Sequence, residues 1–115
     1  MPEECIFCRI VAGKMPAEIV YRDEGFLAFR DIMPQAPVHL LVIPRAHIES
    51  SADLADEQLQ LAGRLIMIAR TLAEEEGIAE SGYRLVINCR SDGGQQVPHL
   101  HLHLIGGRKL SGRIG

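Results

Sequence analysis

The chain has 115 residues, 47% of them hydrophobic, which suffices for one domain spanning 1–115 with its own core. Its formal net charge of −3 excludes the basic surface that sequence-independent nucleic-acid binding needs, so we expect no nucleic-acid partner. No apolar run is long enough to cross a bilayer, residues 1–4 are unlike an export signal, and three cysteines do not suggest a disulfide framework. We therefore expect a cytoplasmic protein without a membrane partner.

The first half of the chain predicts one short helix and then three strands. The helix is an amphipathic stretch closed by Gly13. The first two strands are rich in β-branched and aromatic residues, and a hairpin turn at 23–25 joins them. The third strand is a nearly continuous apolar run that Pro44 ends, and two prolines make 33–37 a loop. The expected ranges are 5–11 for the helix and 18–22, 26–29 and 38–43 for the strands.

The second half predicts a long helix and two further strands. Apolar residues recur at helical spacing from Leu59 to Leu72, after a cap at Asp53 or Asp56, and Gly77 ends the helix. The strands are expected at 83–88 and 99–105, with a loop at 91–96 between them. These elements predict an α+β fold: an antiparallel sheet of about five strands with one long helix on a face and a short N-terminal helix.

The last predicted strand carries three of the five histidines, alternating with leucines in His99-Leu100-His101-Leu102-His103-Leu104. A period of two places the imidazoles on one face, roughly 6.5–7 Å apart, and the leucines on the other. Imidazole can be a nucleophile, a proton donor or a metal ligand near neutral pH. A coincidental polar face and a three-histidine metal site are alternatives. The metal site is strained because the ligands of one strand must converge on one ion, so the row favours catalysis.

The loop Gly93-Gly94-Gln95-Gln96 leads directly into this row. Glycines allow main-chain N–H groups to approach an anion closely, and Gln95 adds a neutral amide donor. A pair of glycines alone indicates no more than a turn. Its position before three imidazoles makes the loop a candidate phosphate cradle.

A second motif, Cys5-Ile6-Phe7-Cys8, has the CxxC spacing. A redox motif would be expected at the start of a helix that follows a strand, and no strand is predicted before it. Two free structural cysteines are a second interpretation. A third is half of a metal site that needs two more ligands, which the histidines could supply.

The histidine row resembles the signature of the histidine triad (HIT) nucleotide-binding proteins. The resemblance covers nearly the whole chain and is nearest to the Hint branch. Several blocks carry it in order and at matching spacing: 29–39, 41–48, Asn88, 91–95, the row itself and 106–108. It implies a HIT-like fold whose sheet is extended across a homodimer.

The resemblance implies a division of roles among the histidines. His101 would be the nucleophile that attacks the α-phosphorus of a nucleotide and carries a covalent nucleotidyl intermediate. His103 would contact the phosphate oxygens and help to protonate the leaving group. His39 would hydrogen-bond to His101 from a neighbouring strand and fix its tautomer.

The resemblance also implies a nucleotide site. Asp31 would accept hydrogen bonds from the ribose hydroxyls, and the phosphate would be positioned by Asn88, Gly94 and Gln95. An apolar slot for the base would be formed by Phe7, Met15 and Ile32. Ordinary structural roles are alternatives: Asp31 as a turn cap, Asn88 as a strand end and Phe7 as a core residue.

Some members of the superfamily, galactose-1-phosphate uridylyltransferase among them, hold zinc with a CxxC and two histidines. Here those ligands would be Cys5, Cys8, His47 and His99. Such a Cys₂His₂ site has no open position and would be structural. Many close Hint-type sequences lack the CxxC, so a chain that has this motif resembles the zinc-bearing subset. No catalytic metal or organic cofactor is implied.

The implied activity is cleavage of a purine nucleoside 5′-phosphoramidate, of the AMP-amine or GMP-amine type, at the α-phosphorus. A dinucleoside polyphosphate hydrolase of the Fhit type is one alternative, and a non-catalytic nucleotide-binding or protein-interaction module is another. The chain contains no tryptophan, unlike the C-terminal tail of some Hint proteins. Leaving-group preference is therefore the least transferable part of the resemblance.

Overall fold

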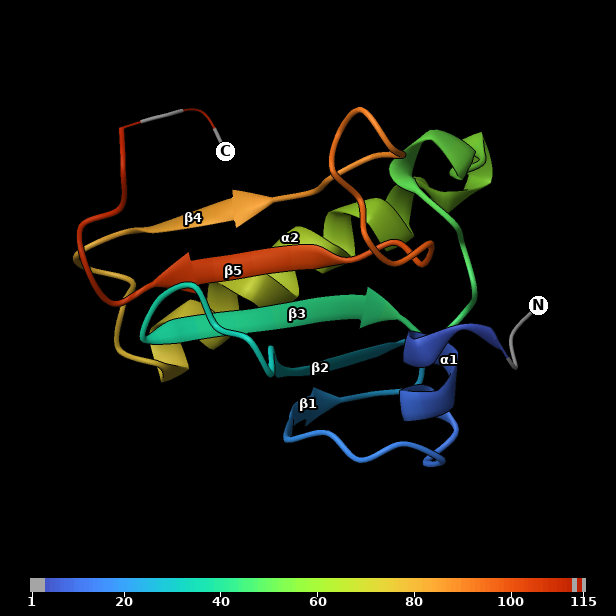
Figure 1. The fold of residues 1–115 in the computed structure, drawn as a ribbon, viewed down its shortest axis with the longest axis horizontal. Helices are drawn as coiled ribbons and strands as arrows, with labels where there is room; N and C mark the ends of the chain where they lie inside the picture. Colours follow the sequence, from blue (N-terminus) through green and yellow to red (C-terminus); the bar gives the residue numbers. More distant parts are fainter. Residues whose placement is uncertain (1–3, 113, 115) are drawn as a thin grey trace.

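Five antiparallel strands form one sheet in the order β1-β2-β3-β5-β4 (Figure 1). The computed structural model describes residues 4–112 and 114. The strands are β1 (Ile19–Arg22), β2 (Phe26–Arg30), β3 (Val38–Pro44), β4 (Tyr83–Val86) and β5 (Leu102–Gly106), and the helices are α1 (Ile6–Val11) and α2 (Leu59–Glu75). Two 3₁₀ turns, Ser51–Asp53 and Asp56–Gln58, precede α2. The predicted α+β architecture is confirmed.

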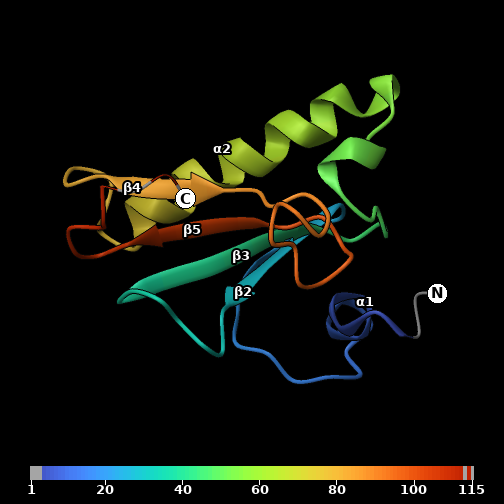
Figure 2. The same ribbon diagram turned by 45° about the horizontal axis from the view of Figure 1, so that its top comes forward.

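The two helices lie on opposite faces of the sheet (Figure 2). The apolar stripe of α2, which includes Leu65, Ile68 and Leu72, packs with β3 and β5 in the larger core. On the other face, α1 contributes to a smaller core with β2 and β3. Every residue of β3 is buried because this central strand is covered on both sides, which explains its nearly continuous apolar sequence.

The histidine row spans the start of β5 rather than lying wholly within it. The predicted start at 99 is wrong: the strand begins at Leu102. The amides of His99 and Leu100 donate instead to the carbonyls of Val97 and Ile48, at 2.8 and 2.6 Å, so they do not join the ladder. The alternation of faces still holds, because Leu100, Leu102 and Leu104 all belong to the larger core.

The other predicted strands and the short helix each shift by one or two residues at one end. β4 ends at Val86, so Asn88 lies in the following loop instead of at the end of a strand. α2 begins at Leu59 and ends at Glu75, and Gly77 follows in the left-handed region with φ of 76°. Within residues 4–112 and 114, none of the helices has the length and apolar character needed to span a membrane.

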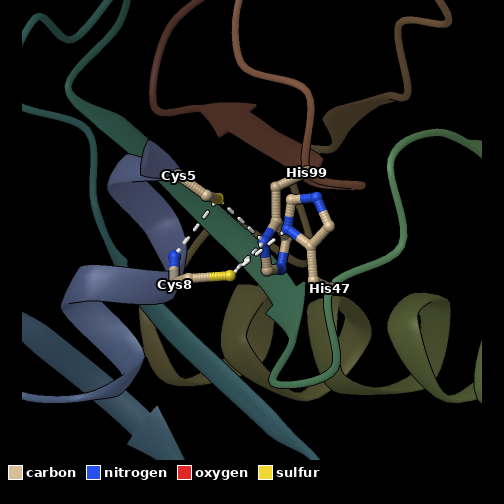
Figure 3. Close-up of side chains that lie close together, drawn as sticks. All are labelled: Cys5, Cys8, His47 and His99. Carbon is tan, nitrogen blue, oxygen red and sulfur yellow. Dashed lines mark hydrogen bonds between the residues drawn. The ribbon is translucent and has the colours of Figure 1, made fainter. Parts of the chain in front are cut away.

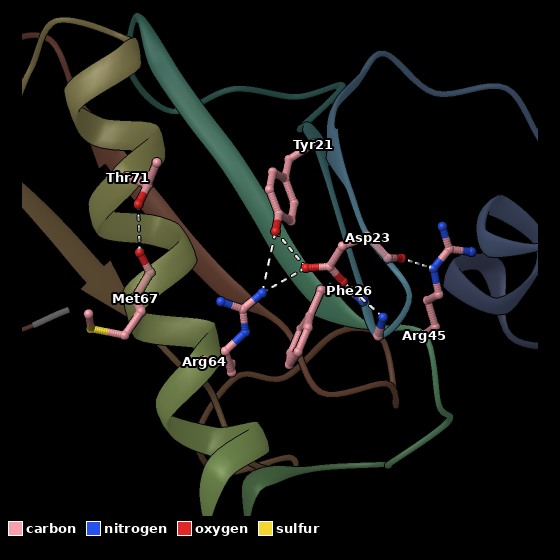
Figure 4. Close-up of polar contacts among 8 residues, drawn as sticks. Tyr21, Asp23, Phe26, Arg45, Arg64, Met67 and Thr71 are labelled. Carbon is pink, nitrogen blue, oxygen red and sulfur yellow. Dashed lines mark hydrogen bonds and ion pairs between the residues drawn. The ribbon is translucent and has the colours of Figure 1, made fainter.

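The hairpin between β1 and β2 is fastened to α2 and to the end of β3 (Figure 4). The Asp23 carboxylate accepts from the amides of Gly25 and Phe26, both at 2.8 Å, which forms the predicted turn. Arg64 of α2 donates to the same carboxylate at 2.8 Å and stacks over the Phe26 ring. Arg45 donates to the main-chain oxygen of Asp23 at 2.7 Å, so the turn is held from two sides.

Candidate functional site

A cleft of about 700 Å³ opens on the face of the sheet that carries α1. Its walls come from α1, the loop after β2, the ends of β3 and β5, and the loop at 88–97. This volume suits a nucleotide-sized ligand. Nine of the expected catalytic and nucleotide-binding residues line it: Phe7, Met15, Asp31, Ile32, His39, Asn88, Gly94, His101 and His103.

His101 lies in the cleft wall with its ring nitrogens in two different environments. Its Nδ1 donates a hydrogen bond to the main-chain oxygen of His99 at 2.7 Å. We therefore assign the Nδ1–H tautomer, which leaves a lone pair on Nε2. No residue in the described part of the chain bonds this Nε2. Burial lowers the pKa of His101, and the His99 carbonyl and Asp31 oppose this effect, so the ring is neutral near pH 7.

His39 and His103 form a hydrogen-bonded pair. The amide of Gln35 donates to Nδ1 of His39 at 3.0 Å, so the proton of His39 is on Nε2. That Nε2 donates to Nδ1 of His103 at 2.9 Å, which places the His103 proton on its own Nε2. His103 thus offers a donor to the cleft, whereas His101 offers a lone pair.

Their shared surroundings keep both rings of this pair neutral. The pKa of His103 is lowered to about 4 by burial and by the neighbouring rings of His101 and His39, with Asp31 in opposition. Burial lowers the pKa of His39 too, and Asp31 again opposes it.

The expected hydrogen bond between His39 and His101 is wrong. β3 and β5 pair with Leu41 opposite His103 and His39 opposite Ile105. His39 is therefore a diagonal neighbour of His103 across the two strands, and it lies farther from His101 than from His103 along β5. The tautomer of His101 is set by the main chain of His99, a contact that side-chain motifs do not reveal.

Asp31 has a structural contact and a place in the cleft. Its Oδ1 accepts from the amide of Met33 at 2.9 Å, which is the turn-capping role considered as an alternative. Its Oδ2 is 3.4 Å from Nε2 of His39, and the side chain is 21% exposed where it borders the cleft. Because Oδ1 alone caps the turn, Oδ2 remains available to accept a hydrogen bond from a hydroxyl of a ligand in the cleft.

The structure does not bring Gln95 into the cleft. Its Nε2 donates to the main-chain oxygens of Glu49 and Val97, at 2.6 and 3.0 Å, and its Oε1 accepts from the amide of Arg90. Gln95 therefore fastens the loop, because its amide groups are already bonded to the main chain. The adjacent Gln96 lines the cleft instead. Two neighbouring glutamines give no sequence signal that distinguishes these roles.

Asn88 and Gly94 meet on the other side of this loop. Nδ2 of Asn88 donates to the main-chain oxygen of Gly93 at 2.8 Å. Gly94 has φ of 80°, so the turn needs the glycine there. Both residues line the cleft, as expected for a loop that borders a phosphate.

The apolar end of the cleft is formed by residues of different exposure. Phe7 is 6% exposed and packs edge-on against Phe29 and His101, with ring centroids 5.4 and 5.2 Å apart. It is therefore a core residue and a cleft residue at once. Ile32 is 90% exposed at the rim, where a flat ligand could cover it. Met15 also lines this end.

Cys5, Cys8, His47 and His99 form a second cluster of side chains (Figure 3). Their Sγ and Nδ1 atoms all lie within 4.8 Å of one another. Nδ1 of His99 is 3.3 Å from Sγ of Cys5, and Nδ1 of His47 is 3.2 Å from Sγ of Cys8. We call these four side chains the Cys–His cluster.

The donor set of the Cys–His cluster fits a tetrahedral zinc ion. Two thiols and two imidazoles are a common structural zinc ligand set. Nε2 of His99 donates to the main-chain oxygen of Pro44 at 2.8 Å, which leaves the lone pair of Nδ1 directed at the sulfurs. A ligating histidine commonly has this second hydrogen bond. The amide of Cys8 also donates to Sγ of Cys5, at 3.3 Å.

A second group, Asp31, His39 and His103, is close enough for a metal but fits one poorly. A neutral imidazole that binds a metal through Nε2 carries its proton on Nδ1. At His39 that proton would face the amide of Gln35, which is itself a donor. The hydrogen bonds therefore favour a proton on Nε2 of His39 over a metal ion.

The fold and the cleft define a class of α+β proteins that present a row of histidines where a central strand begins. The sequence profile of the HIT domain matches residues 12–110. The purine nucleoside phosphoramidase of Escherichia coli K12 is 51% identical over 110 residues, which cover 96% of this chain and 92% of that protein. An uncharacterised HIT-like protein of Synechococcus elongatus is 49% identical, and the match covers 96% of both chains.

Solved structures agree with the sequence comparisons. A HIT family hydrolase from Legionella pneumophila superposes with a TM-score of 0.94 at 50% identity, covering 96% of this chain and 99% of that one. A histidine triad protein from Clostridium difficile gives 0.93 at 40% identity, covering 96% of both chains. The chain belongs to the histidine triad family.

Proposed function

We propose that this protein is a nucleotide hydrolase or transferase that cleaves purine nucleoside 5′-phosphoramidates at the α-phosphorus. The observation that carries the proposal is the complementary pair of neighbouring rings in the cleft: a lone pair on Nε2 of His101 and a proton on Nε2 of His103. The similarity to the E. coli phosphoramidase supports the substrate class.

The proposed reaction has two displacements at phosphorus. Nε2 of His101 forms a bond to the α-phosphorus while the phosphorus–nitrogen bond breaks, and the departing amine takes a proton from water. The hydroxide left by that water then attacks the phosphorus and breaks the nucleotidyl–histidine bond, which releases a nucleoside 5′-monophosphate and restores neutral His101. His103 donates a hydrogen bond to the charge that develops on the phosphate oxygens. The His99 carbonyl stabilises the positive charge on His101 in the intermediate.

The other cleft residues are proposed to orient the nucleotide. Asp31 accepts from the ribose, and Asn88 and Gly94 border the phosphate. Gln96 replaces Gln95 as the glutamine that reaches the substrate, because Gln95 is bonded to the main chain. The base lies in the slot formed by Phe7, Met15 and Ile32.

The test is hydrolysis of adenosine 5′-phosphoramidate by the wild type and by His101→Gly. The variant should lose at least about 10³-fold in kcat, because no nucleophile remains, and should still bind AMP. Intact-mass spectrometry of rapidly quenched wild type should show one added nucleotidyl group. An unchanged rate in His101→Gly would overturn the assignment. Parallel assays with a diadenosine polyphosphate distinguish the Fhit-type reaction, and AMP binding without turnover of either substrate would favour a binding module.

We further propose that the Cys–His cluster holds a structural zinc ion. When bound, zinc would cross-link α1 to the segments that follow β3 and precede β5, without itself contacting the substrate. Protein purified without chelator should contain one equivalent of zinc by elemental analysis, and Cys8→Ser should contain far less. Cys89→Ser is the matched control because this third cysteine lies outside the cluster.

A homodimer in the cytoplasm completes the proposal. β4 is the last strand of the sheet, and its outer edge has no partner strand among the described residues. Ile66 and Met67 of α2 expose apolar side chains to solvent. A second copy that extends the sheet along β4 would cover such surfaces. Analytical ultracentrifugation should give twice the chain mass, and cell fractionation tests the location.

A further inference from the structure

The Cys–His cluster and the cleft meet in a single residue, His99. The side chain of His99 faces the cluster through Nδ1, 3.3 Å from Sγ of Cys5. The main-chain oxygen of the same residue accepts a hydrogen bond from Nδ1 of His101 at 2.7 Å. One residue therefore joins the cluster to the contact that leaves Nε2 of His101 with a lone pair.

The side chain of His99 adds to the restraint that the amide hydrogen bonds of His99 and Leu100 place on this main chain. Residues 99–101 precede β5, so the sheet ladder does not hold them. The His99 ring is fully buried, and its Nε2 donates to the main-chain oxygen of Pro44 at 2.8 Å. Its other nitrogen faces the two sulfurs, at 3.3 Å from Cys5 and 3.6 Å from Cys8. A cation in the cluster would therefore hold the ring at Nδ1, where its contacts within the protein are longer than the one at Nε2.

The CxxC segment also supports His101 directly. Phe7, which lies between the two cysteines, packs edge-on against the rings of His99 and His101, with centroids 5.9 and 5.2 Å apart. α1 is only six residues long, too short to be stable by its own helical hydrogen bonds. Its position against His101 therefore relies on the packing of Phe7 in the smaller core and on the anchoring of Cys5 and Cys8.

We propose that His99 is a positioning residue through which a cation bound at the Cys–His cluster sets the tautomer of His101 and places its ring. The proposal rests on the roles given above to His101 and to the cluster. A purely structural metal would change the fraction of folded protein without changing the chemistry of the molecules that remain folded. A positioning metal changes the rate of those folded molecules.

The experiment removes the metal while the fold is monitored. Wild-type protein is treated with a chelator, and Cys8→Ser is prepared in parallel, since Cys8 has no contact with His101 among the interactions described. Circular dichroism gives the folded fraction, and elemental analysis gives the metal content. Steady-state kinetics with adenosine 5′-phosphoramidate separate kcat from KM. Two-dimensional ¹H–¹⁵N spectra of the histidine rings report each tautomer at one fixed pH.

Loss of the metal should lower kcat by roughly 10-fold to 100-fold per folded molecule, with KM changed by less than about twofold. The His101 ring should change from the Nδ1–H form to a mixture of tautomers, while the His39–His103 pair keeps its pattern. Zinc should restore both signals in chelated wild type and not in Cys8→Ser. Cys89→Ser should behave as the wild type throughout.

Three results would overturn the proposal: no bound metal in the untreated protein, an unchanged His101 tautomer after its removal, or an unchanged kcat in folded metal-free protein. If Cys8→Ser does not fold, His47→Asn removes a ligand that contacts Cys8 and the His99 ring from outside the CxxC. If the wild type hydrolyses no phosphoramidate, the proposed function fails. The ring spectra with and without metal then still decide whether His99 couples the two sites.

Discussion

Nε2 of His39 lies 2.9 Å from Nδ1 of His103, so two neutral imidazoles on neighbouring strands share one hydrogen bond beside the cleft. The direction of this bond is fixed from outside the pair, because the amide of Gln35 occupies the other nitrogen of His39. Hydrogen bonds of this kind, which a sequence pattern does not contain, place the proton on Nδ1 in His101 and on Nε2 in His103.

The first prediction concerns this pair. His39→Phe removes the donor to Nδ1 of His103 while it keeps an aromatic ring in the same space. His103 should then populate both tautomers, and kcat for adenosine 5′-phosphoramidate should fall by roughly 10-fold to 100-fold, with KM nearly unchanged. His39→Gln, which retains an N–H donor, should recover part of the loss. A His39→Phe enzyme with wild-type kcat would contradict the proposed role of the pair.

The second prediction is a loss of stability on acidification. His103 has a pKa of about 4 in the folded protein, lowered by burial and by His101 and His39, with Asp31 in opposition. A histidine in the unfolded chain has a pKa of about 6.5. Between these values the unfolded chain binds a proton that folded His103 does not. The free energy of unfolding is therefore fully retained above pH 6.5, falls as the pH drops toward 4, and loses no more from this group below that.

Urea denaturation at several values between pH 4.5 and 7.5 measures this loss. For His103 it should amount to at most about 3 kcal/mol, and the partial exposure of the ring reduces it. His103→Asn removes the group and should show a flatter dependence on pH. Equal slopes for the wild type and the variant would refute the assignment.

The third prediction separates two adjacent glutamines. Gln95→Ala removes a side chain whose amide bonds to Glu49, Val97 and Arg90, so the free energy of unfolding should fall by about 1–3 kcal/mol. Gln96→Ala should leave stability unchanged and raise KM, because Gln96 lines the cleft. Thermal unfolding and steady-state kinetics on both variants make the comparison. The reverse pattern would show that Gln95 contacts the substrate after all.

The fourth prediction concerns the clamp on the hairpin turn. Arg64→Ala removes an ion pair with Asp23 and the stacking on Phe26, and both groups are partly exposed. The expected loss is about 1 kcal/mol, or about 4 °C in Tm, with no change in kcat. Thr71→Ala on the same helix is the control: within residues 4–112 and 114 its hydroxyl bonds only to the carbonyl of Met67 one turn earlier, so its removal should be neutral.

The sequence predicts the elements whose identity depends on side-chain periodicity. α2 and β3 were accessible in this way, and so was the separation of the leucines of the row, which face the larger core, from its histidines. These features follow from which face of an element each side chain occupies. The HIT-like fold followed from the resemblance, and the comparisons bear it out.

Features set by main-chain hydrogen bonds were not accessible. β5 starts at Leu102 because the two preceding amides donate to Val97 and Ile48, and no side-chain pattern records this. The partner of His39 depends on the register between β3 and β5, which the two strand sequences do not fix by themselves. Gln95 was misplaced for a similar reason, since the turn geometry alone decides which glutamine faces the cleft.

The alternation in the row has a consequence for how this protein can change over time. Leu100, Leu102 and Leu104 lie in the larger core, and the three histidines that alternate with them are on the other side of the chain. Inserting or deleting one residue here would send imidazoles into the core and leucines into the cleft, so both would fail together. Divergence in this segment is therefore confined to substitution in place, and new specificities must arise in the surrounding loops and termini.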